Sequence, residues 1–430
     1  MNLAAKHDGA VTHVVIVGAG FAGLHCAQQL ASNHRVQITL IDKHNYQQFQ
    51  PLLYQVAIGI LPPDNAAFNL RDVFLQHERV AVVMAEISSV DLKARTVTAA
   101  SGDTFRGDVV VLAAGAEVNL FGVPGAEQFT LPMYSFEDAE HLRSRLLELF
   151  EDADAAAVAG RQTEINVVVV GGGATGVETA GAIADVIRRM PKHLFPNVDF
   201  KSVNVSLVDA SASVLAPFSQ TSRDYAAKVL RERGVLLRLG VSVREVTMND
   251  VLLSDGERVN ASFVVWAGGL QASALSHALG IATGHGSRVD VALDLTLIGY
   301  TGIYALGDFA NTTDDAGQPL PQLASVAQQA GRHCANNILA DIAGEARKPF
   351  VYVDRGIMAM IGRNAAVAEL GTKRRPITGI LAFFAWLAVH ATLMTSIRAR
   401  IATVFEWAWD YFGSVRVNPI LDRPRTRKRN

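Results

Sequence analysis

Short runs of apolar residues that lead into glycine recur along the chain. The first run covers His13–Val17, which is typical of a buried parallel strand that ends in a tight turn. Helical spacing of apolar residues follows over Phe21–Leu30, and a second apolar run covers Val36–Ile41. These stretches predict a strand, a helix and a second parallel strand, which together form a βαβ unit.

The same pattern returns about 150 residues further along the chain. Asn166–Val170 is predicted to be a strand, a helix is expected from about Gly176, and Asn204–Val208 is predicted to be the next strand. The stretch Phe136–Asp154, rich in Glu, Asp and Arg, is predicted to be a connecting helix. The chain is therefore predicted to be an α/β protein with two Rossmann-like dinucleotide folds.

Two further junctions, at which a strand leads into glycine, are predicted at Val264–Leu270 and Gly302–Asp308. Asp341–Lys348 is predicted to be a linker, and the alternation over Phe350–Leu370 predicts strands. These elements extend the second half of the chain beyond the two βαβ units.

Composition narrows the classes of function. A length of 430 residues fits two or three domains, and a net charge of -2 argues against a nucleic-acid partner. The two cysteines, Cys26 and Cys334, form no CxxC motif, so neither a zinc ribbon nor a redox dithiol of that type is available, and no metal site is expected. They are predicted to be buried small hydrophobes, which is consistent with a cytosolic compartment. The N-terminus carries no secretory signal pattern.

The first glycine motif, in VVIVGAGFAGL, predicts a site for FAD. Gly18 permits the tight turn, Gly20 lets the backbone approach a pyrophosphate, and Gly23 lets the helix pack closely on the strand. Asp42 follows at the end of the next strand, where a carboxylate can accept hydrogen bonds from a ribose diol. The alternative is a glycine-rich turn without a ligand.

The second motif, in VVVVGGGATGVETAG, predicts a site for NADH. Gly171, Gly173 and Gly176 repeat the fingerprint, and Asp209 ends the following strand. A carboxylate there would repel a 2′-phosphate, so NADH is expected to be preferred over NADPH. Glu178 follows on the helix, where it could contact the nicotinamide or its ribose, or only complement the helix dipole.

A third motif, TGIYALGDFA, ends in Gly307 and Asp308. The aspartate could bind the ribityl or pyrophosphate part of a flavin, or it could be a plain helix N-cap. A helix is expected from near Gln322, and its positive N-terminal end could stabilise an anionic reduced flavin.

Together these motifs resemble the two-dinucleotide flavoproteins of the pyridine nucleotide–disulfide reductase superfamily. The blocks DKHNYQQFQPLLYQVA, WAGG at 266–269 and IMAMIGRNAAVAEL at 357–370, with the aromatic C-terminus, resemble bacterial type II NADH:quinone oxidoreductases. The resemblance covers nearly the whole chain. It implies an NADH domain inserted into the FAD domain, followed by a membrane-binding segment, with NADH and quinone on opposite faces of the flavin.

The resemblance implies four segments and a set of site residues. The segments are an FAD domain over 10–118 and 295–345, an NADH domain over 119–294, and a C-terminal domain with membrane-anchoring helices over 346–430. The residues expected at FAD are Gly18, Gly20, Phe21, Ala22, Gly23, Asp42, Lys43, Gly115, Gly307, Asp308 and Ala324. Those expected at NADH are Gly171, Gly173, Thr175, Gly176, Glu178, Asp209 and Gly268.

Glu178 matches the family's glutamate on the nicotinamide side, and Gln329 matches the second glutamine of its AQxxxQ quinone motif; both are candidate catalytic residues. The chain departs from this motif at Ser325, where the family has the first glutamine, and at Ala330, where it has another glutamine. A quinone site at Ser325 and Gln329 is expected, with a pocket that differs from the family pattern. Gln329 could also only cap or pack.

The C-terminal segment is predicted to bind a membrane. Pro376–Met394 contains no Asp, Glu, Lys or Arg and could just span a bilayer. The next stretch is amphipathic, Trp407, Trp409 and Tyr411 suit an interface, and the basic tail RPRTRKRN suits anionic lipid. A monotopic anchor is favoured over a single span, a dimer interface or a buried helix.

These features lead to a membrane-attached NADH dehydrogenase that passes electrons from NADH through FAD to a quinone without pumping protons, on the cytoplasmic face of the inner membrane. The sequence leaves open whether the protein forms a homodimer. One alternative is a soluble NADH-dependent reductase that uses oxygen or a protein carrier, for which the C-terminus would be dispensable. Another is a non-catalytic flavoprotein that senses NADH. A sulfide-oxidising relative is disfavoured because that chemistry needs a cysteine pair near the flavin.

Overall fold

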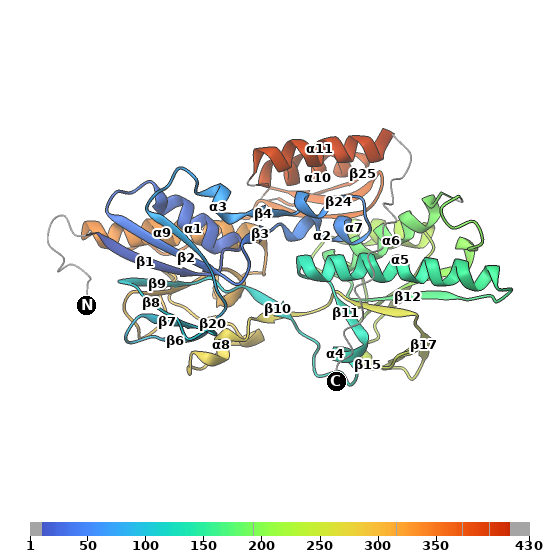
Figure 1. Ribbon diagram of the computed structural model, residues 1–430, viewed down its shortest axis with the longest axis horizontal. Helices are drawn as coiled ribbons and strands as arrows, with labels where there is room; N and C mark the ends of the chain where they lie inside the picture. Colours follow the sequence, from blue (N-terminus) through green and yellow to red (C-terminus); the bar gives the residue numbers. More distant parts are fainter. Residues whose placement is uncertain (1–10, 192, 315, 372, 395, 413–430) are drawn as a thin grey trace. The chain divides into compact units, whose positions relative to one another are not determined.

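The computed structural model describes residues 11–412 apart from 192, 315, 372 and 395. The chain divides into two compact units, each built from three separate stretches (Figure 1). Unit 1 comprises residues 1–48, 68–117 and 270–354, and unit 2 comprises 49–67, 118–269 and 355–430. The stretch 118–269 of unit 2 is therefore inserted in the chain between two stretches of unit 1. The functional division into four segments stays a prediction.

Unit 1 is built around a parallel five-stranded sheet. The strands are ordered β21-β9-β1-β2-β5, and their bounds are Ile303–Ala305, Val109–Leu112, Thr12–Val17, Val36–Asp42 and Val80–Met84. The strands β1 and β9 are almost wholly buried because the sheet is covered on both faces. The predicted strands of the first βαβ unit are confirmed within one residue at each end.

Smaller elements complete unit 1. The helices α1 (Phe21–Ala31) and α9 (Ala324–Ala343) pack together on the sheet, and Gly331 of α9 lies against the backbone of Ala22. Cys26 and Cys334 are fully buried in this contact, as the sequence predicts. The remaining elements are β3 (Tyr46–Gln48), α3 (Leu70–Val73), β6 (Ile87–Asp91), β7 (Thr96–Ala99), β8 (Thr104–Arg106), β19 (Leu270–Ala272), α8 (Leu275–Ala278), β20 (Val289–Asp290) and β22 (Ala310–Asn311). Two short strands lie at boundaries and have one residue in unit 2, namely β4 (Ala67–Asn69) and β10 (Ala116–Val118).

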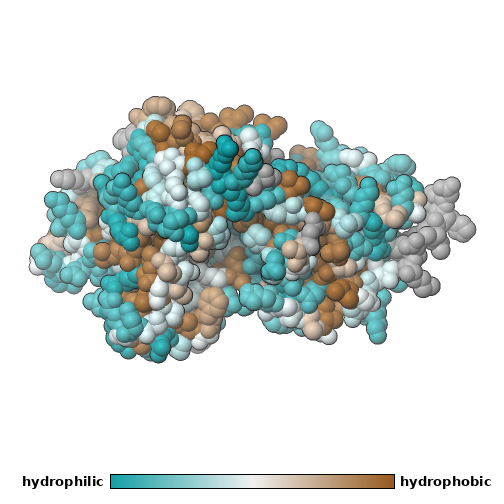
Figure 2. Space-filling view, turned by 180° about the vertical axis from the view of Figure 1, so that it is seen from behind, coloured by the Kyte–Doolittle hydropathy of each residue, from teal (hydrophilic) through white to brown (hydrophobic). Residues whose placement is uncertain are grey.

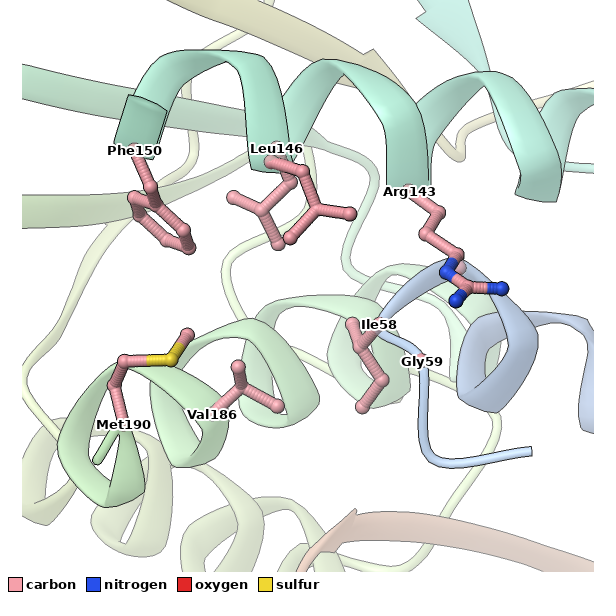
Figure 3. A pocket seen from close by; sticks show the side chains of 9 residues that line it. Ile58, Gly59, Arg143, Leu146, Phe150, Val186 and Met190 are labelled. Carbon is pink, nitrogen blue, oxygen red and sulfur yellow. The ribbon is translucent and has the colours of Figure 1, made fainter. Parts of the chain in front are cut away.

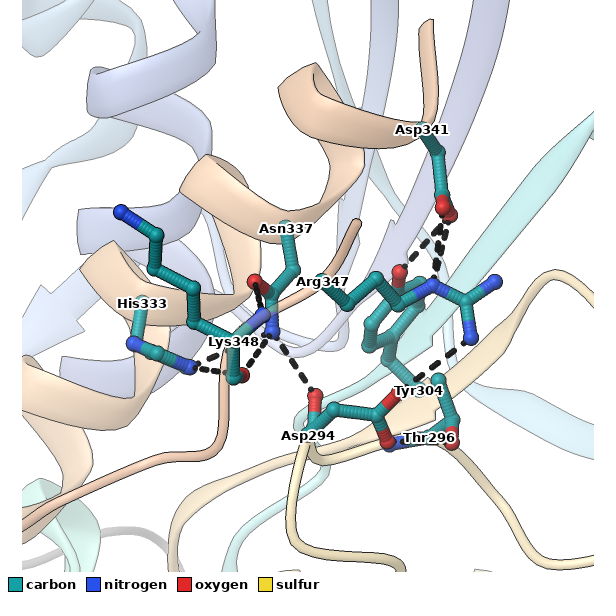
Figure 4. A network of polar contacts seen from close by, with 8 residues as sticks. All are labelled: Asp294, Thr296, Tyr304, His333, Asn337, Asp341, Arg347 and Lys348. Atoms are coloured by element: carbon teal, nitrogen blue, oxygen red, sulfur yellow. Dashed lines mark hydrogen bonds and ion pairs between the residues drawn. The ribbon is translucent and has the colours of Figure 1, made fainter. Parts of the chain in front are cut away.

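A polar network fixes the C-terminal end of α9 to the sheet of unit 1 (Figure 4). The Arg347 guanidinium lies 2.9 Å from the Asp341 carboxylate and 3.3 Å from that of Asp294, and the Tyr304 hydroxyl donates to Asp341 over 3.1 Å. Burial would raise the pKa of Asp294, but hydrogen bonds from Thr296 and the Arg347 charge outweigh it and lower the pKa. The predicted linker 341–348 is therefore wrong at its start, because α9 continues to Ala343.

Unit 2 contains the second parallel five-stranded sheet. The order is β11-β18-β12-β13-β14, with bounds Thr130–Pro132, Phe263–Trp266, Ile165–Val170, Val203–Asp209 and Val235–Leu239. Three long helices belong to this fold: α5 (Phe136–Val158), α6 (Ala174–Arg189) and α7 (Gln220–Glu232). The second predicted βαβ unit and the connecting helix are confirmed; α6 begins two residues earlier than predicted. Short elements are α4 (Ala126–Phe129), β15 (Val243–Val246), β16 (Asp250–Leu253) and β17 (Arg258–Asn260).

The helices α5 and α6 leave only a minute gap where they meet. The gap is lined by Arg143, Leu146 and Phe150 from α5, Val186 and Met190 from α6, and the turn Ile58–Gly59 (Figure 3). Its volume is about 10 Å³, which is at or below the room that a single water molecule needs. This part of unit 2 is therefore a packed core and not a ligand site.

The C-terminal stretch of unit 2 forms an antiparallel sheet and two helices. The sheet joins β23 (Gly356–Gly362), β24 (Ala365–Leu370) and β25 (Arg375–Gly379), so the strands predicted over 350–370 are confirmed from 356 onward. The helices are α10 (Ile380–Leu393) and α11 (Ile397–Phe412), and the short helix α2 (Leu53–Ala57) also belongs to unit 2. Gly181 lets α6 approach the backbone of Ile361 in β23 closely.

The candidate span Pro376–Met394 is only partly helical. Its first residues form β25, which leaves α10 with 14 residues and a length of about 21 Å, whereas a span needs about 30 Å. Within the part of the chain that the structure describes, no helix combines the length and apolar character of a membrane span. The basic tail 423–430 lies outside the described residues.

Candidate functional site

The first glycine motif forms a turn that only glycine can make. Gly18 follows β1 with a φ of +96°, and a side chain there would collide with the carbonyl of Ala113. A side chain at Gly23 would collide with the carbonyl of Gly18, so this glycine lets α1 lie against the end of β1. At Gly20, the N-cap of α1, a side chain would meet nothing within 4 Å. The middle glycine therefore opens onto free space at the helix N-terminus, where a phosphate group can approach the backbone.

The second motif repeats this geometry in unit 2. Gly171 follows β12 with a φ of +114°, and Gly176 lies against the carbonyl of Gly171. Gly173 is the N-cap of α6, and a side chain there again would meet nothing within 4 Å. Both units thus hold a glycine loop whose middle glycine faces open space. This observation fits a dinucleotide pyrophosphate at each loop.

The two acidic residues have matching partners. Asp42 accepts hydrogen bonds from the Ala19 N–H at 2.6 Å and the His44 N–H at 2.8 Å. Asp209 accepts from the Gly172 N–H at 2.5 Å and the Ser211 N–H at 2.6 Å. Each carboxylate therefore holds the second residue of its own glycine loop. Burial raises the pKa of Asp42, and the hydrogen bonds from Ala19 and His44 oppose that effect.

Several residues predicted at FAD meet where β21 ends. A side chain at Gly307, which has a φ of +63°, would lie 3.1 Å from Cβ of Ala22 and 3.4 Å from Cβ of Ala327 on α9. The Gln322 amide donates to the Asp308 carbonyl over 3.3 Å, which ties the approach to α9 to this turn. The helix α9 begins at Ala324, close to the predicted start. The third motif and the start of α9 are thus brought beside α1, as a common site for one cofactor requires.

Asp308 lies in a low-polarity setting. Burial raises the pKa of its carboxyl to about 6, and the positive charge of Arg288 opposes that rise. Arg288 is buried and donates to the Leu320 carbonyl over 3.2 Å. Arg288 belongs to none of the sequence motifs, and its burial depends on the contact with Leu320, which lies 32 residues further along the chain.

Glu178 faces the C-terminal sheet of unit 2. Its carboxylate accepts a hydrogen bond from the Met360 N–H of β23 over 3.0 Å. Burial raises the pKa of Glu178 to about 8, against the effects of the Met360 N–H and of the Trp386 indole, which acts from beyond hydrogen-bonding distance. The contact with Met360 is a third arrangement beside the two that the sequence left open.

A polar chain that the sequence did not reveal lies near Glu178. The Trp407 indole of α11 donates to the Gln55 carbonyl oxygen over 2.7 Å, and the Gln55 amide donates to the Tyr54 hydroxyl over 2.9 Å. Burial, and then the neighbouring Glu178, raise the pKa of Tyr54. The expectation that Trp407 suits a membrane interface is wrong, because it is 9% exposed and bonded inward. The block PLLYQVA was recognised, but nothing local indicates that it pairs with residue 407.

The two residues predicted at the quinone site already bond to the segment after α9. The Gln329 amide donates to the Val353 carbonyl and accepts from the Val353 N–H, both over 3.0 Å. The hydroxyl groups of Ser325 and Tyr352 lie 2.9 Å apart. All four residues belong to unit 1. In this arrangement one N–H and the oxygen of the Gln329 amide are engaged.

The remaining predicted residues lie at or next to the glycine loops and strand ends. Phe21 and Lys43 directly follow the first loop and β2, and Gly115 follows β9 with a φ of +67°. Gly268 lies against the backbone of Gly171, and Thr175 is exposed in the first turn of α6. Each therefore lies in or beside one of the two glycine loops or a strand end of the same unit.

The helix α11 has apolar residues on its outer face. Ala399, Thr403 and Trp407 form the inner face and are buried. The exposed residues of α10 and α11 are mainly large and apolar, and they account for brown atoms in the region of these helices (Figure 2). They are Ile380, Leu381, Phe384, Ile397, Ile401, Val404, Phe405, Trp409 and Phe412. This outer apolar face is far larger than scattered surface hydrophobics would give.

Comparisons with known proteins agree along nearly the whole chain. Residues 12–331 match the family described as pyridine nucleotide-disulphide oxidoreductase, and residues 355–414 match the NDH2 C-terminal domain. The chain is 33% identical over 418 residues to "Type II NADH:quinone oxidoreductase Ndh" of Mycobacterium tuberculosis, covering 94% of this chain and 89% of that one. It is 30% identical over 383 residues to a type II NADH:quinone oxidoreductase of Staphylococcus aureus, covering 86% and 92%.

The fold also has a solved counterpart. The structure of NDH2 from Plasmodium falciparum in complex with NADH aligns with a TM-score of 0.83 at 17% identity, covering 94% of this chain and 99% of that one. At this identity the likeness concerns the fold. It extends over both units and the C-terminal stretch.

Proposed function

This chain belongs to the type II NADH:quinone oxidoreductases, and from that premise we propose which of its residues bind FAD, NADH, quinone and lipid. The protein is an FAD-dependent NADH dehydrogenase that delivers two electrons to a quinone and pumps no protons. FAD, when bound, supplies the two-electron chemistry. We place FAD at the loop of unit 1 and NADH at the loop of unit 2.

The pair of matching glycine loops carries this assignment. Both middle glycines, Gly20 and Gly173, open onto free space at a helix N-terminus, and each loop is held by an aspartate at the end of the next strand. Asp308 and Gly307 complete the proposed flavin site in unit 1, since they lie beside Ala22 and the start of α9. An absorbance scan of the purified protein should show flavin bands. A folded protein without them would contradict the assignment.

The proposed NADH site predicts a nucleotide preference. A fixed negative charge at Asp209 repels a 2′-phosphate, so kcat/KM for NADH should exceed that for NADPH by about tenfold or more. Asp209→Asn keeps a hydrogen-bond acceptor for the loop and removes the charge. It should therefore lower the ratio of kcat/KM for NADH to kcat/KM for NADPH. Asp42→Asn, with the same bonding in unit 1, is the matched control and should leave the ratio unchanged. Equal efficiency of both nucleotides in the parent protein would refute the assignment.

Gln329 is proposed to hydrogen-bond a quinone carbonyl without adding charge to an apolar pocket. The contact with Val353 uses only one N–H of the Gln329 amide, so the second N–H can donate to the quinone while that contact is kept, and the gain is about one neutral hydrogen bond. Gln329→Ala should raise the quinone KM or lower kcat by about fivefold, and stopped-flow reduction of flavin by NADH should stay nearly unchanged.

Ser325→Gln, which restores the family pattern, is the companion variant for Gln329→Ala. It should change quinone preference and spare the NADH half-reaction. If both variants slow flavin reduction and leave quinone kinetics unchanged, these residues lie on the wrong side of the flavin. If Gln329→Ala changes only thermal stability, Gln329 has the packing role that its bonds to Val353 also allow.

Peripheral membrane association accompanies this family, and we propose the residues that provide it. The outer apolar face of α10 and α11 is the proposed lipid contact, on the cytoplasmic face of the inner membrane. Its support is the exposure of large apolar side chains such as Ile401 at 67% and Phe405 at 63%. Burying such side chains in lipid contributes about 1.5–3 kcal/mol each.

The test uses substitutions and not a truncation. Removal of residues 377–430 would also remove the buried side chains Phe383 and Trp386 and expose the core of unit 2. Ile401→Glu with Phe405→Glu should instead reduce liposome flotation by at least about tenfold and leave NADH oxidation with a soluble quinone intact. Leu236→Glu with Met248→Glu, at exposed apolar positions elsewhere in unit 2, is the control and should float like the parent. Unchanged flotation of the first pair would place the anchor elsewhere.

A further inference from the structure

Unit 2 contains a second, larger cavity that neither the glycine loops nor the quinone motif uses. It lies among α2, α6, β23, α10 and α11 and has a volume of about 70 Å³. Its walls are mostly apolar or aromatic, and they include Tyr54, Ala182, Met360, Phe383, Leu387 and Trp407. Of these, all but Leu387 are buried.

The buried end of the cavity has few polar groups, and its amide is partly engaged. Gln55 accepts from the Trp407 indole and donates one N–H to the Tyr54 hydroxyl. An occupant of the inner end is therefore held mainly by contact with apolar walls. A group that needs several hydrogen bonds there would leave most of them unmade at a cost of about 1–3 kcal/mol each.

The more exposed end of the cavity is lined by two arginines and two aspartates, and both aspartates are paired with an arginine other than Arg363. Asp185 is paired with Arg233, and Arg189 is paired with Asp410 over 3.2 Å. Arg363 lies 4.8 Å from the ring centre of Tyr411 and donates to the Tyr411 carbonyl. Among the described residues, no carboxylate lies within ion-pair distance of the Arg363 guanidinium. Arginine binds carboxylate and phosphate groups well because its donors form a planar fork.

Size decides which apolar group can enter. An engineered cavity of about 150 Å³ binds benzene, and this cavity has about half that volume. A substituted quinone ring is larger than benzene, so the cavity as formed is too small for it. A slim hydrocarbon chain fits, and it would reach the cavity beneath helices whose outer faces are apolar and exposed.

We propose that this cavity binds an anionic amphiphile, with the end of its hydrocarbon chain among Met360, Phe383 and Trp407 and its carboxylate or phosphate at Arg363. The ligand is either a free fatty acid or an anionic phospholipid, which share this chemistry. No residue of either glycine loop lines this cavity. The proposal depends on the proposed lipid contact of α10 and α11 in one respect only, which is how the ligand reaches the cavity from the membrane.

Quenching of tryptophan fluorescence tests the proposal on the full-length holoenzyme in a detergent with an uncharged headgroup. The probes are 9,10-dibromostearate, the matching dibromo alcohol and phosphatidylglycerol with a dibrominated chain. All proteins carry Trp409→Phe, because this tryptophan is 45% exposed and would report adsorption to the outer face. Trp407 lines the cavity, and the ring centre of Trp386 lies 6.1 Å from that of Trp407.

The expected result is saturable quenching by dibromostearate or by the brominated lipid, at least about tenfold tighter than by the alcohol. Arg363→Gln should weaken acid binding by about tenfold and leave alcohol binding unchanged. Arg398→Gln, at an exposed arginine of α11 outside the cavity, should bind like the parent. Ala182→Leu fills the cavity and should weaken both probes; bound flavin and circular dichroism verify the fold of each variant.

Which anionic probe quenches distinguishes a fatty acid from a phospholipid, and either result supports the site. The proposal is overturned if neither anionic probe quenches, if the alcohol binds as tightly as the acid, or if Arg363→Gln binds like Arg398→Gln. Loss of liposome flotation in the Ile401→Glu, Phe405→Glu pair without loss of quenching would separate this site from the membrane anchor.

Discussion

Gly173→Val is expected to stop NADH from reducing the flavin while the flavin stays bound. Gly173 has a φ of -71° and a ψ of -175°, which any residue adopts, and a side chain there meets no atom of the protein within 4 Å. The added bulk enters only the space where the pyrophosphate of NADH is proposed to lie. Loss of two or more charge-assisted hydrogen bonds should lower kcat/KM for NADH by about 100-fold or more.

Gly20→Val is the matched variant in unit 1. Its backbone is also extended, with a φ of -67°, and its side chain also meets nothing within 4 Å. This variant should fold but purify without flavin, whereas Gly173→Val should purify yellow with an unchanged melting temperature. If the two variants show the reverse pattern, the nucleotides are assigned to the wrong units. If both lose the fold, the space at these glycines is not a ligand site.

Glu178→Gln is expected to stabilise the protein at alkaline pH. The pKa of this buried carboxyl is about 8 in the folded protein and about 4.5 when unfolded, so the folded state holds the proton more tightly. The free energy of unfolding therefore falls as pH rises from about 4.5 to about 8, by as much as about 1.4 kcal/mol per unit. A glutamine removes this dependence. Denaturant unfolding should show that the free energy of unfolding of the variant, relative to that of the parent, rises by on the order of 3 kcal/mol between pH 5 and pH 8.5.

Glu369, which also belongs to unit 2, is a control because its pKa shifts in the opposite direction. Burial would raise its pKa, but hydrogen bonds from Ser219 and Ser222 outweigh that effect and lower it. The stability from Glu369 is present above its unfolded pKa and is lost as pH falls through the folded value. Glu369→Gln should therefore destabilise the protein at neutral pH. A Glu178→Gln variant that loses stability at pH 8.5, as Glu369→Gln does, would show that folding does not raise the pKa of Glu178.

The two nucleotide folds were predictable because their signals are local. A buried strand, a glycine turn and a helix follow one another within about 20 residues, and each glycine has a steric reason that a short segment reveals. The positions of Asp42 and Asp209 follow from the same βαβ pattern, in which each aspartate ends the second strand. The strands and helices of both βαβ units consequently lie within a few residues of their predicted bounds.

Features that depend on contacts between distant segments were not predictable. The hydropathy of Pro376–Met394 does not show that its first residues pair with β24, and so a short helix resembled a span. The direction of Trp407 depends on Gln55, which lies far away in sequence. In the same way, the contact of Gln329 with Val353 and that of Glu178 with Met360 arise only from packing.

Anaerobic stopped-flow spectroscopy of the purified holoenzyme tests the central claim most directly. The two half-reactions are followed at the flavin band, first with NADH and then with a short-chain quinone. We expect that NADH bleaches the flavin, that the quinone restores its absorbance, and that both steps are at least as fast as steady-state turnover. Bleaching that oxygen reverses but quinone does not, or a flavin that NADH leaves oxidised, would contradict electron transfer from NADH through FAD to a quinone.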